Sequence, residues 1–351
     1  MTGTLLPGIV ARRIPTSRYA ANVLKRAADP DDAGTTIVFV HGNVSSSLFW
    51  QPLMLSLPEG TRALAVDLRG FGDSETLPVD ATRGVRDFSD DVAAVLEELG
   101  TGAVHLVGWS MGGGVVMQLL LDRPDLVRSL TLVSTVSPYG FGGTAADGTL
   151  LNADASGTGG GGANPDFVAR LAAGDTGEDS PTSPRAVYRS AYVAPGFTTE
   201  YEDIWVESML STATGEDNYP GDASTTDEWP GFAPGTRGVL NTMAPTYFDT
   251  TGIVDAAAKP PILWIHGAVD AIVNDASFFD LNQLGAAGII PGWPGEEVAP
   301  PQPMLVQIRS VLERYAAAGG DTREVVFEDC GHSPHIERPE EFLAELTAWV
   351  G

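Results

Sequence analysis

Ser110 lies in a sequence that could make its hydroxyl a nucleophile. It is the middle residue of a Gly-x-Ser-x-Gly pattern, between a strand-like run at 103–107 and a helical run at 115–121. A serine in a sharp strand-to-helix turn has close neighbours, and Gly108 and Gly112 permit this because they lack a Cβ. Such a turn would present the hydroxyl at a sheet edge, where the N-terminus of the next helix can stabilise negative charge.

A serine hydroxyl needs a base, and the base needs a group that orients it. His332 is the candidate base because it lies in the loop directly after the predicted strand 322–327. Asp270 is the candidate acid because it follows the predicted strand 261–266 in a Gly-x-x-Asp pattern. The other four histidines lie within strands, at strand ends or directly before the last helix: His41, His105, His266 and His335.

The elements that must position these residues alternate along the chain. Buried strands are predicted at 35–40, 62–66, 103–107, 127–134, 261–266 and 322–327. Helices are predicted at 87–99, 111–121, 274–284, 305–318 and 339–350, and an N-terminal hairpin at 9–14 and 19–25. Alternating strands and helices favour an α/β fold, with a mostly parallel central sheet flanked by helices.

The motifs together resemble the α/β-hydrolase family. His41-Gly42-Asn43 after a strand, Gly-x-Ser-x-Gly, Gly-x-x-Asp and Gly-His follow one another in the family's order. The resemblance implies that Ser110 is the nucleophile, His332 the base after the last strand, and Asp270 the acid between them. Some relatives place the acid one strand earlier, but 134–137 contains no carboxylate, and Asp275 is the alternative.

An acyl-transfer site also needs two backbone N–H groups aimed at the developing oxyanion. The resemblance implies the N–H groups of Met111 and Asn43, with Val44 as the alternative to Asn43. The loop after His41 is also similar to that of haloalkane dehalogenases, in which residues at the positions of Asn43 and Trp109 hold a halide. Those enzymes need a carboxylate nucleophile, whereas Ser110 suits attack on acyl carbon. Dehalogenation is therefore rejected, and Trp109 is expected to form a pocket wall.

The segment 137–258 has a different character from the rest of the chain. Predicted strands are absent, glycine and aromatic residues are frequent, and short helices are predicted at 165–172, 184–193, 199–211 and 238–248. We expect a helical lid at 137–258, inserted between two parts of the α/β core at 1–136 and 259–351. The glycine run 157–162 predicts a mobile loop. We expect five residues to contact the substrate: Val44, Trp109, Tyr192, Trp205 and Met243.

Composition narrows the range of partners. The chain has 351 residues and a formal net charge of −26, which argues against binding nucleic acid or anionic membranes. No apolar run is long enough for a membrane span, and segment 1–7 does not resemble a signal peptide, so a cytoplasmic location is expected. Metal-ligand spacing and nucleotide fingerprints are not found, so neither a metal nor a cofactor is expected. The sequence is compatible with a monomer or a homo-oligomer.

These observations predict a serine esterase or lactonase that acts through an acyl-enzyme. The large aromatic lid suggests a bulky, apolar ester or lactone, and family members that open macrocyclic lactones such as zearalenone suggest one candidate substrate. The same scaffold also supports carbon–carbon bond hydrolysis, hydroxynitrile cleavage and cofactor-free perhydrolysis. A non-catalytic ligand receptor is the alternative outside enzymes, and the presence of all three triad residues disfavours it.

Overall fold

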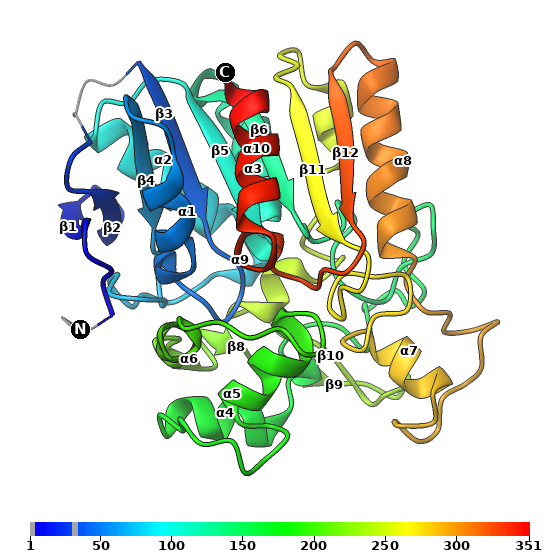
Figure 1. Ribbon diagram of the computed structural model, residues 1–351. Helices are drawn as coiled ribbons and strands as arrows, with labels where there is room; N and C mark the ends of the chain where they lie inside the picture. The colour runs from blue at the N-terminus through cyan, green and yellow to red at the C-terminus, as the bar shows by residue number, and fades with distance from the viewer. Residues whose placement is uncertain (1–3, 30–33) are drawn as a thin grey trace.

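The computed structural model describes residues 4–29 and 34–351. Part of segment 1–7, on which the prediction about a signal peptide rests, lies outside these described residues. Its centre is an eight-stranded sheet with the order β1-β2-β4-β3-β5-β6-β11-β12 (Figure 1). β1 and β2 pair antiparallel at one edge, and the remaining strands are parallel to one another. The strands are β1 (Ile9–Pro15), β2 (Ala20–Arg26), β3 (Thr35–Val40), β4 (Thr61–Val66), β5 (Val104–Trp109), β6 (Val127–Val133), β11 (Ile262–Gly267) and β12 (Thr322–Phe327).

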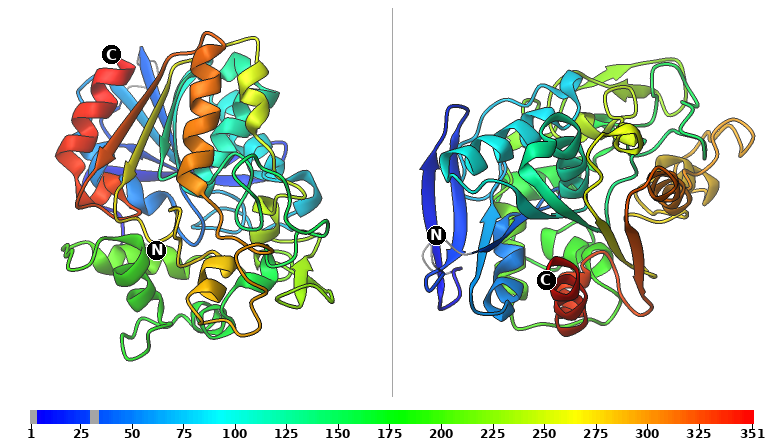
Figure 2. Two further views of the ribbon diagram at one scale, coloured as in Figure 1. Left: turned by 90° about the vertical axis from the view of Figure 1, so that its right-hand side faces the viewer. Right: turned by 90° about the horizontal axis from the view of Figure 1, so that it is seen from above.

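Helices cover both faces of the sheet, which explains why its central strands are continuous apolar runs. One face carries α1 (Gln51–Ser56), α9 (Pro334–Glu337) and α10 (Pro339–Val350). The other carries α2 (Arg86–Glu98), α3 (Met111–Asp122) and α8 (Met304–Ala317) (Figure 2). The described helices include none with both the length and the apolar character needed to cross a bilayer. The mostly parallel α/β architecture predicted from the sequence is therefore correct.

A cap covers the carboxyl ends of the parallel strands (Figure 1). Its helices are α4 (Pro165–Ala172), α5 (Pro184–Val187) and α6 (Glu202–Leu210), and α5 continues as a π-helical turn at Tyr188–Tyr192. The expectation of an entirely helical lid is wrong, because short strands pair within it: β7 (Thr214–Gly215), β8 (Tyr219–Pro220), β9 (Ala223–Thr225) and β10 (Phe232–Pro234). Repeated proline and glycine residues disfavour a helix in the part of the cap that holds these strands. For the same reason the predicted helix 238–248 shrinks to a 3-10 turn at Leu240–Met243.

The glycine run 157–162 packs within the cap and does not project from it as an open loop. It contains a 3-10 turn at Gly160–Gly162. A Cβ on Gly161 would lie 2.4 Å from the Phe232 ring, so only glycine permits this close approach. The absence of side chains on the glycines of this run therefore lets its backbone pack closely against neighbouring parts of the cap.

A second segment, residues 268–303, also joins the cap layer, which corrects the assignment of all of 259–351 to the core (Figure 2). Its helix α7 (Leu281–Ala286) begins later than the predicted helix 274–284. Asn274, Ser277 and Asp280 accept hydrogen bonds from backbone N–H groups two residues ahead of them. Such local bonds compete with helix formation, so turns replace the predicted first half of the helix.

Asp280 makes the stability of this segment depend on pH. Its carboxylate accepts from the N–H groups of Asn282 at 3.1 Å and Gln302 at 2.7 Å, and burial raises its pKa from 3.8 to about 6. The folded protein therefore binds the proton of the Asp280 carboxyl group more tightly than the unfolded chain does. The stability that this proton contributes to the folded state is lost as pH rises from about 4 through 6. We expect Asp280→Asn to gain roughly 2 kcal/mol of unfolding free energy relative to the native protein between pH 4.5 and 8. Thermal unfolding of both proteins from pH 4.5 to 8 measures this, and a constant difference in their midpoints would contradict it.

Candidate active site

Ser110 occupies the turn between β5 and α3 with φ 56° and ψ −120°, in the sparsely populated left-handed region. Two close approaches surround this turn. A Cβ on Gly112 would lie 2.4 Å from the carbonyl oxygen of Val40, and one on Gly42 would lie 2.9 Å from Cβ of Ser110. The glycines thus let β3, β5 and α3 meet closely around the serine, as the Gly-x-Ser-x-Gly pattern predicts.

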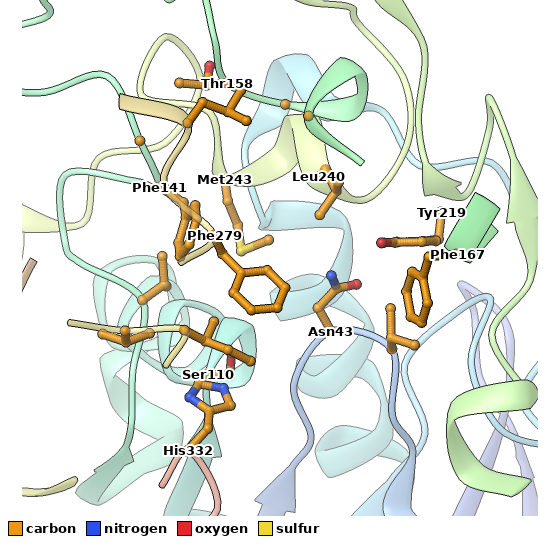
Figure 3. Close-up of a pocket in the computed structure, with 18 of the residues that line it drawn as sticks. Asn43, Ser110, Phe141, Thr158, Phe167, Tyr219, Leu240, Met243, Phe279 and His332 are labelled. Atoms are coloured by element: carbon orange, nitrogen blue, oxygen red, sulfur yellow. The ribbon is translucent and has the colours of Figure 1, made fainter. Parts of the chain in front are cut away.

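His332 and Asp270 form a buried pair at the ends of β12 and β11. Nδ1 of His332 donates to Oδ2 of Asp270 at 2.8 Å, and both residues are at least 97% buried. The other carboxylate oxygen, Oδ1, accepts from the N–H groups of Ile272 at 2.8 Å and Val273 at 3.0 Å. These bonds fix the carboxylate, and its bond to Nδ1 selects the tautomer in which Nε2 is the acceptor atom of a neutral imidazole ring. Ser110 and His332 line the same cavity and lie beside each other in Figure 3.

The backbone around His332 is held by two further groups. The carboxylate of Glu337 accepts from the N–H groups of Gly331 at 3.0 Å and Ser333 at 3.2 Å, on either side of the histidine. It also accepts from the N–H of Ala194 in the cap at 2.7 Å. Trp109 donates its indole N–H to the carbonyl of His332 at 2.8 Å. Trp109 is therefore a support for the histidine loop, and the expectation that it forms a wall of the pocket is wrong.

The backbone also orients the two N–H groups predicted to stabilise an oxyanion. The carbonyl of Gly42 accepts from Nδ1 of His41 at 2.7 Å and Oγ of Ser45 at 2.9 Å. Because N–H and C=O of a trans peptide point in opposite directions, the N–H of Asn43 faces away from His41. Nε2 of His41 accepts from the N–H of Leu68 at 3.0 Å, which places the ring proton on Nδ1.

The peptide after Ser110 is oriented in the same way. Its carbonyl accepts from the N–H groups of Gly113 at 3.0 Å and Val136 at 3.2 Å. The N–H of Met111 belongs to the same peptide and therefore faces the opposite way. As the first residue of α3, Met111 has no intrahelical acceptor for this N–H. Both N–H groups are therefore held in fixed directions before any substrate binds.

Tyr192 connects the cap to this loop. Its hydroxyl lies 2.9 Å from the carbonyl oxygen of Asn43 and 3.2 Å from that of Val44, and donates to them. Val44 has φ 45°, so the loop turns sharply at this point. Tyr192 lines the cavity as predicted from the sequence, but its hydroxyl is already used to hold the loop.

We therefore expect Tyr192→Phe to lower kcat roughly tenfold with little change in KM, because the loop would hold the Asn43 N–H less rigidly. Complete loss of one oxyanion donor lowers kcat roughly 10²–10³-fold, and this value is the upper limit for the effect of Tyr192→Phe. Steady-state kinetics measure the split between kcat and KM. Tyr188→Phe is the matched control, because its hydroxyl in the same π-helical turn is buried without a partner in the described structure. Equal losses in both variants, or a change confined to KM, would contradict the role given to Tyr192.

The cavity has a volume of about 150 Å³, measured as the space open to the centre of a water molecule. That is room for on the order of ten waters. Of the residues expected to contact the substrate, Val44 and Met243 line the cavity, whereas Trp205 does not. The indole of Trp205 stacks on Phe49 with ring centroids 4.9 Å apart, where the cap packs against the α/β core.

Several lining residues have no clear signal in the sequence. Phe167 and Tyr219 come from the cap, and Phe279 comes from the second cap segment (Figure 3). Leu281 of the second cap segment also lines the cavity. Phe279 lies in a turn, Tyr219 in a two-residue strand and Leu281 at the start of a six-residue helix. Such short elements have no periodic pattern that indicates which way a side chain faces.

The other candidate groups have structural partners. Burial lowers the pKa of His335, whose ring stacks on Trp50 at 4.2 Å. Burial raises the pKa of Cys330, which keeps it as a thiol. Asp275, the alternative acid, accepts from the N–H of Leu305 at 2.7 Å at the start of α8. Across residues 4–29 and 34–351, no three potential metal-ligating side chains gather into a cluster.

Comparison with known proteins agrees with this architecture. The family model described as alpha/beta hydrolase fold matches residues 35–160. A 2-(acetamidomethylene)succinate hydrolase from Mesorhizobium japonicum is 32% identical over 130 residues, 37% of this chain and 44% of that protein. Carboxylesterase YbfK from Bacillus subtilis is 29% identical over 113 residues, 32% of this chain and 38% of that protein. The chain thus spans less than half the length of the curated relatives that it matches.

Solved structures extend the likeness over the remaining sequence. The crystal structure of carboxylesterase CesB (YbfK) from Bacillus subtilis matches 99% of this chain and 93% of that chain, with a TM-score of 0.58 at 17% identity. The structure of E-2-(acetamidomethylene)succinate hydrolase matches 97% of this chain and 99% of that chain, with a TM-score of 0.56 at 20% identity. The family match and the solved structures agree with the strand order, and this chain has the α/β-hydrolase fold.

Proposed function

We propose that this protein is a serine hydrolase that cleaves carboxylic esters. One observation carries the proposal: the buried Asp270–His332 hydrogen bond of 2.8 Å, with His332 and Ser110 on the wall of one cavity. An oriented base beside a serine hydroxyl is what acyl transfer requires. The names of similar proteins, which include a carboxylesterase, support the same class of reaction.

The reaction would proceed through an acyl-enzyme. Oγ of Ser110 attacks the ester carbonyl carbon while Nε2 of His332 takes the hydroxyl proton, and Asp270 stabilises the resulting imidazolium. The N–H groups of Asn43 and Met111 hold the oxyanion. His332 then gives its proton to the leaving alcohol. A water molecule, deprotonated by His332, attacks the acyl carbon and releases the acid together with the free serine.

The cavity wall favours a neutral, largely apolar substrate. Within the described chain, its lining includes no Asp, Glu, Lys or Arg side chain. Apolar groups dominate it, among them Val136, Phe141, Leu240 and Ile272. A charged substrate group would be desolvated here without a counter-ion, which is costly. Bulky esters and lactones fit this environment, and macrocyclic lactones such as zearalenone belong to the proposed range.

A substrate panel tests this proposal. It contains p-nitrophenyl esters from acetate to decanoate, p-nitrophenyl succinate as a charged ester, the corresponding anilides, simple lactones and zearalenone. We expect turnover of neutral esters, with kcat/KM for the succinate at least tenfold below that for an uncharged ester of equal length. A well-folded protein that hydrolyses no ester or lactone would contradict the proposal, and binding without turnover would favour a receptor.

A further inference from the structure

The hydroxyl of Tyr219 differs from those of Thr158 and Tyr192, the other hydroxyls that the cap contributes to the cavity wall. Tyr219 lies on β8 in the cap, is only 5% exposed, and directs its hydroxyl into the cavity (Figure 3). In the described structure no hydrogen-bond partner is found for it. By contrast, the hydroxyl of Thr158 donates to the carbonyl of Ala155 at 2.7 Å, and that of Tyr192 donates to the loop at Asn43.

Its surroundings define what this hydroxyl can bind. The ring of Tyr219 packs edge-on against Phe167, with centroids 6.3 Å apart and an interplanar angle of 88°. Burial raises the pKa of Tyr219, so the phenol stays protonated and able to donate a hydrogen bond. Buried tyrosine hydroxyls usually have a partner, because an unpaired polar group in apolar surroundings is unfavourable.

The partner must be neutral. A carboxylate or phosphate in this part of the cavity would find no lysine or arginine among the lining residues of the described chain. A phenol donor among mostly apolar side chains suits one acceptor oxygen carried on an apolar skeleton. Phe167 and Leu240 line the same cavity, so the carbon skeleton around that oxygen would meet apolar side chains (Figure 3).

We propose that the Tyr219 hydroxyl is a specificity site, which binds a neutral ether, hydroxyl or carbonyl oxygen of the substrate at a distance from the ester held at Ser110. The preferred substrate is then an apolar ester or lactone with one further oxygen substituent. This inference rests on the proposed function and specifies the substrate class of the same cavity.

Binding and turnover are measured separately to test it. The ligands are hexyl hexanoate and analogues in which one CH₂ group is replaced by oxygen, moved stepwise along the acyl chain and then along the alcohol. Dissociation constants are measured by calorimetry on Ser110→Ala, which binds without hydrolysing. The same measurements are then made on the double variants Ser110→Ala/Tyr219→Phe and Ser110→Ala/Tyr188→Phe. Hydrolysis of the series is followed by pH-stat with Ser110 intact.

We expect at least one oxygen position to bind roughly fivefold tighter than the neighbouring positions, the worth of one net hydrogen bond. Tyr219→Phe should abolish this preference while binding hexyl hexanoate unchanged. Tyr188→Phe should retain it, because that hydroxyl is buried and does not reach the cavity.

A flat profile in both backgrounds, absence of binding throughout, or a preference that survives Tyr219→Phe would overturn the inference. A preference in binding without any hydrolysis would uphold the Tyr219 site and contradict the proposed esterase function. Failure of one proposal is therefore distinguishable from failure of the other.

Discussion

Ser110→Ala is expected to lower kcat for ester hydrolysis roughly a millionfold while the protein stays folded. Removal of a nucleophile that acts in concert with its base abolishes the covalent route, and only binding and oxyanion stabilisation remain. Alanine keeps the Cβ, so the packing of the turn against Gly42 is retained. Initial rates with a p-nitrophenyl ester, together with circular dichroism of both proteins, measure the loss and the fold.

Ser134→Ala is the matched control for this variant. Ser134 follows the neighbouring strand β6, also has a positive φ of 41°, and its buried Oγ lacks a partner in the structure as described. Its kcat should stay within about twofold of the native value, because Ser134 is not among the described residues that line the cavity. Comparable loss in both variants would mean that the turn geometry, and not the Ser110 hydroxyl, is responsible.

Asp270→Asn is expected to lower kcat roughly 10⁴-fold, the second-largest effect. The N–H groups of Ile272 and Val273 both donate to Oδ1, so the single amide oxygen of asparagine would occupy that position. The NH₂ group must then face Nδ1 of His332. Nδ1 would become the acceptor, the ring proton would move to Nε2, and the histidine could no longer take a proton from Ser110.

Two comparisons test this explanation. Asp275→Asn, at the carboxylate that caps α8, should leave kcat within about twofold of the native value. The double variant Ser110→Ala/Asp270→Asn should be no slower than Ser110→Ala alone, since the residues act as a unit. Additive losses, or an Asp270→Asn variant with near-native kcat, would show that Asp270 does not orient the base.

The core and the positions of the triad residues follow from local sequence. β3 and β12 coincide with their predicted ranges. β3 is a continuous apolar and β-branched run, and β12 ends in the apolar run Val325–Phe327 directly before a turn. Ser110, Asp270 and His332 each lie in the segment that follows a parallel strand. Because parallel strands end at one edge of the sheet, the sequence alone predicts that these three residues lie close together.

The cap could not be predicted in the same way. Trp109 reads as a pocket residue because it adjoins Ser110, yet strand alternation turns its side chain to the opposite side, where it reaches the carbonyl of His332. Tyr219 lies next to Pro220 in a two-residue strand, too short for any periodic signal. The bond from Tyr192 to Asn43 joins residues 149 positions apart, and only the tertiary fold brings them together.

The central claim is that Ser110 is an activated nucleophile, and covalent labelling tests it most directly. The native protein, Ser110→Ala and His332→Ala are each incubated with a fluorophosphonate, and their intact masses are measured. We predict one adduct on the native protein, mapped to Ser110 by peptide digestion, none on Ser110→Ala, and a rate at least 10³-fold lower on His332→Ala. A folded native protein that stays unlabelled, or an adduct that persists in Ser110→Ala, would contradict the account.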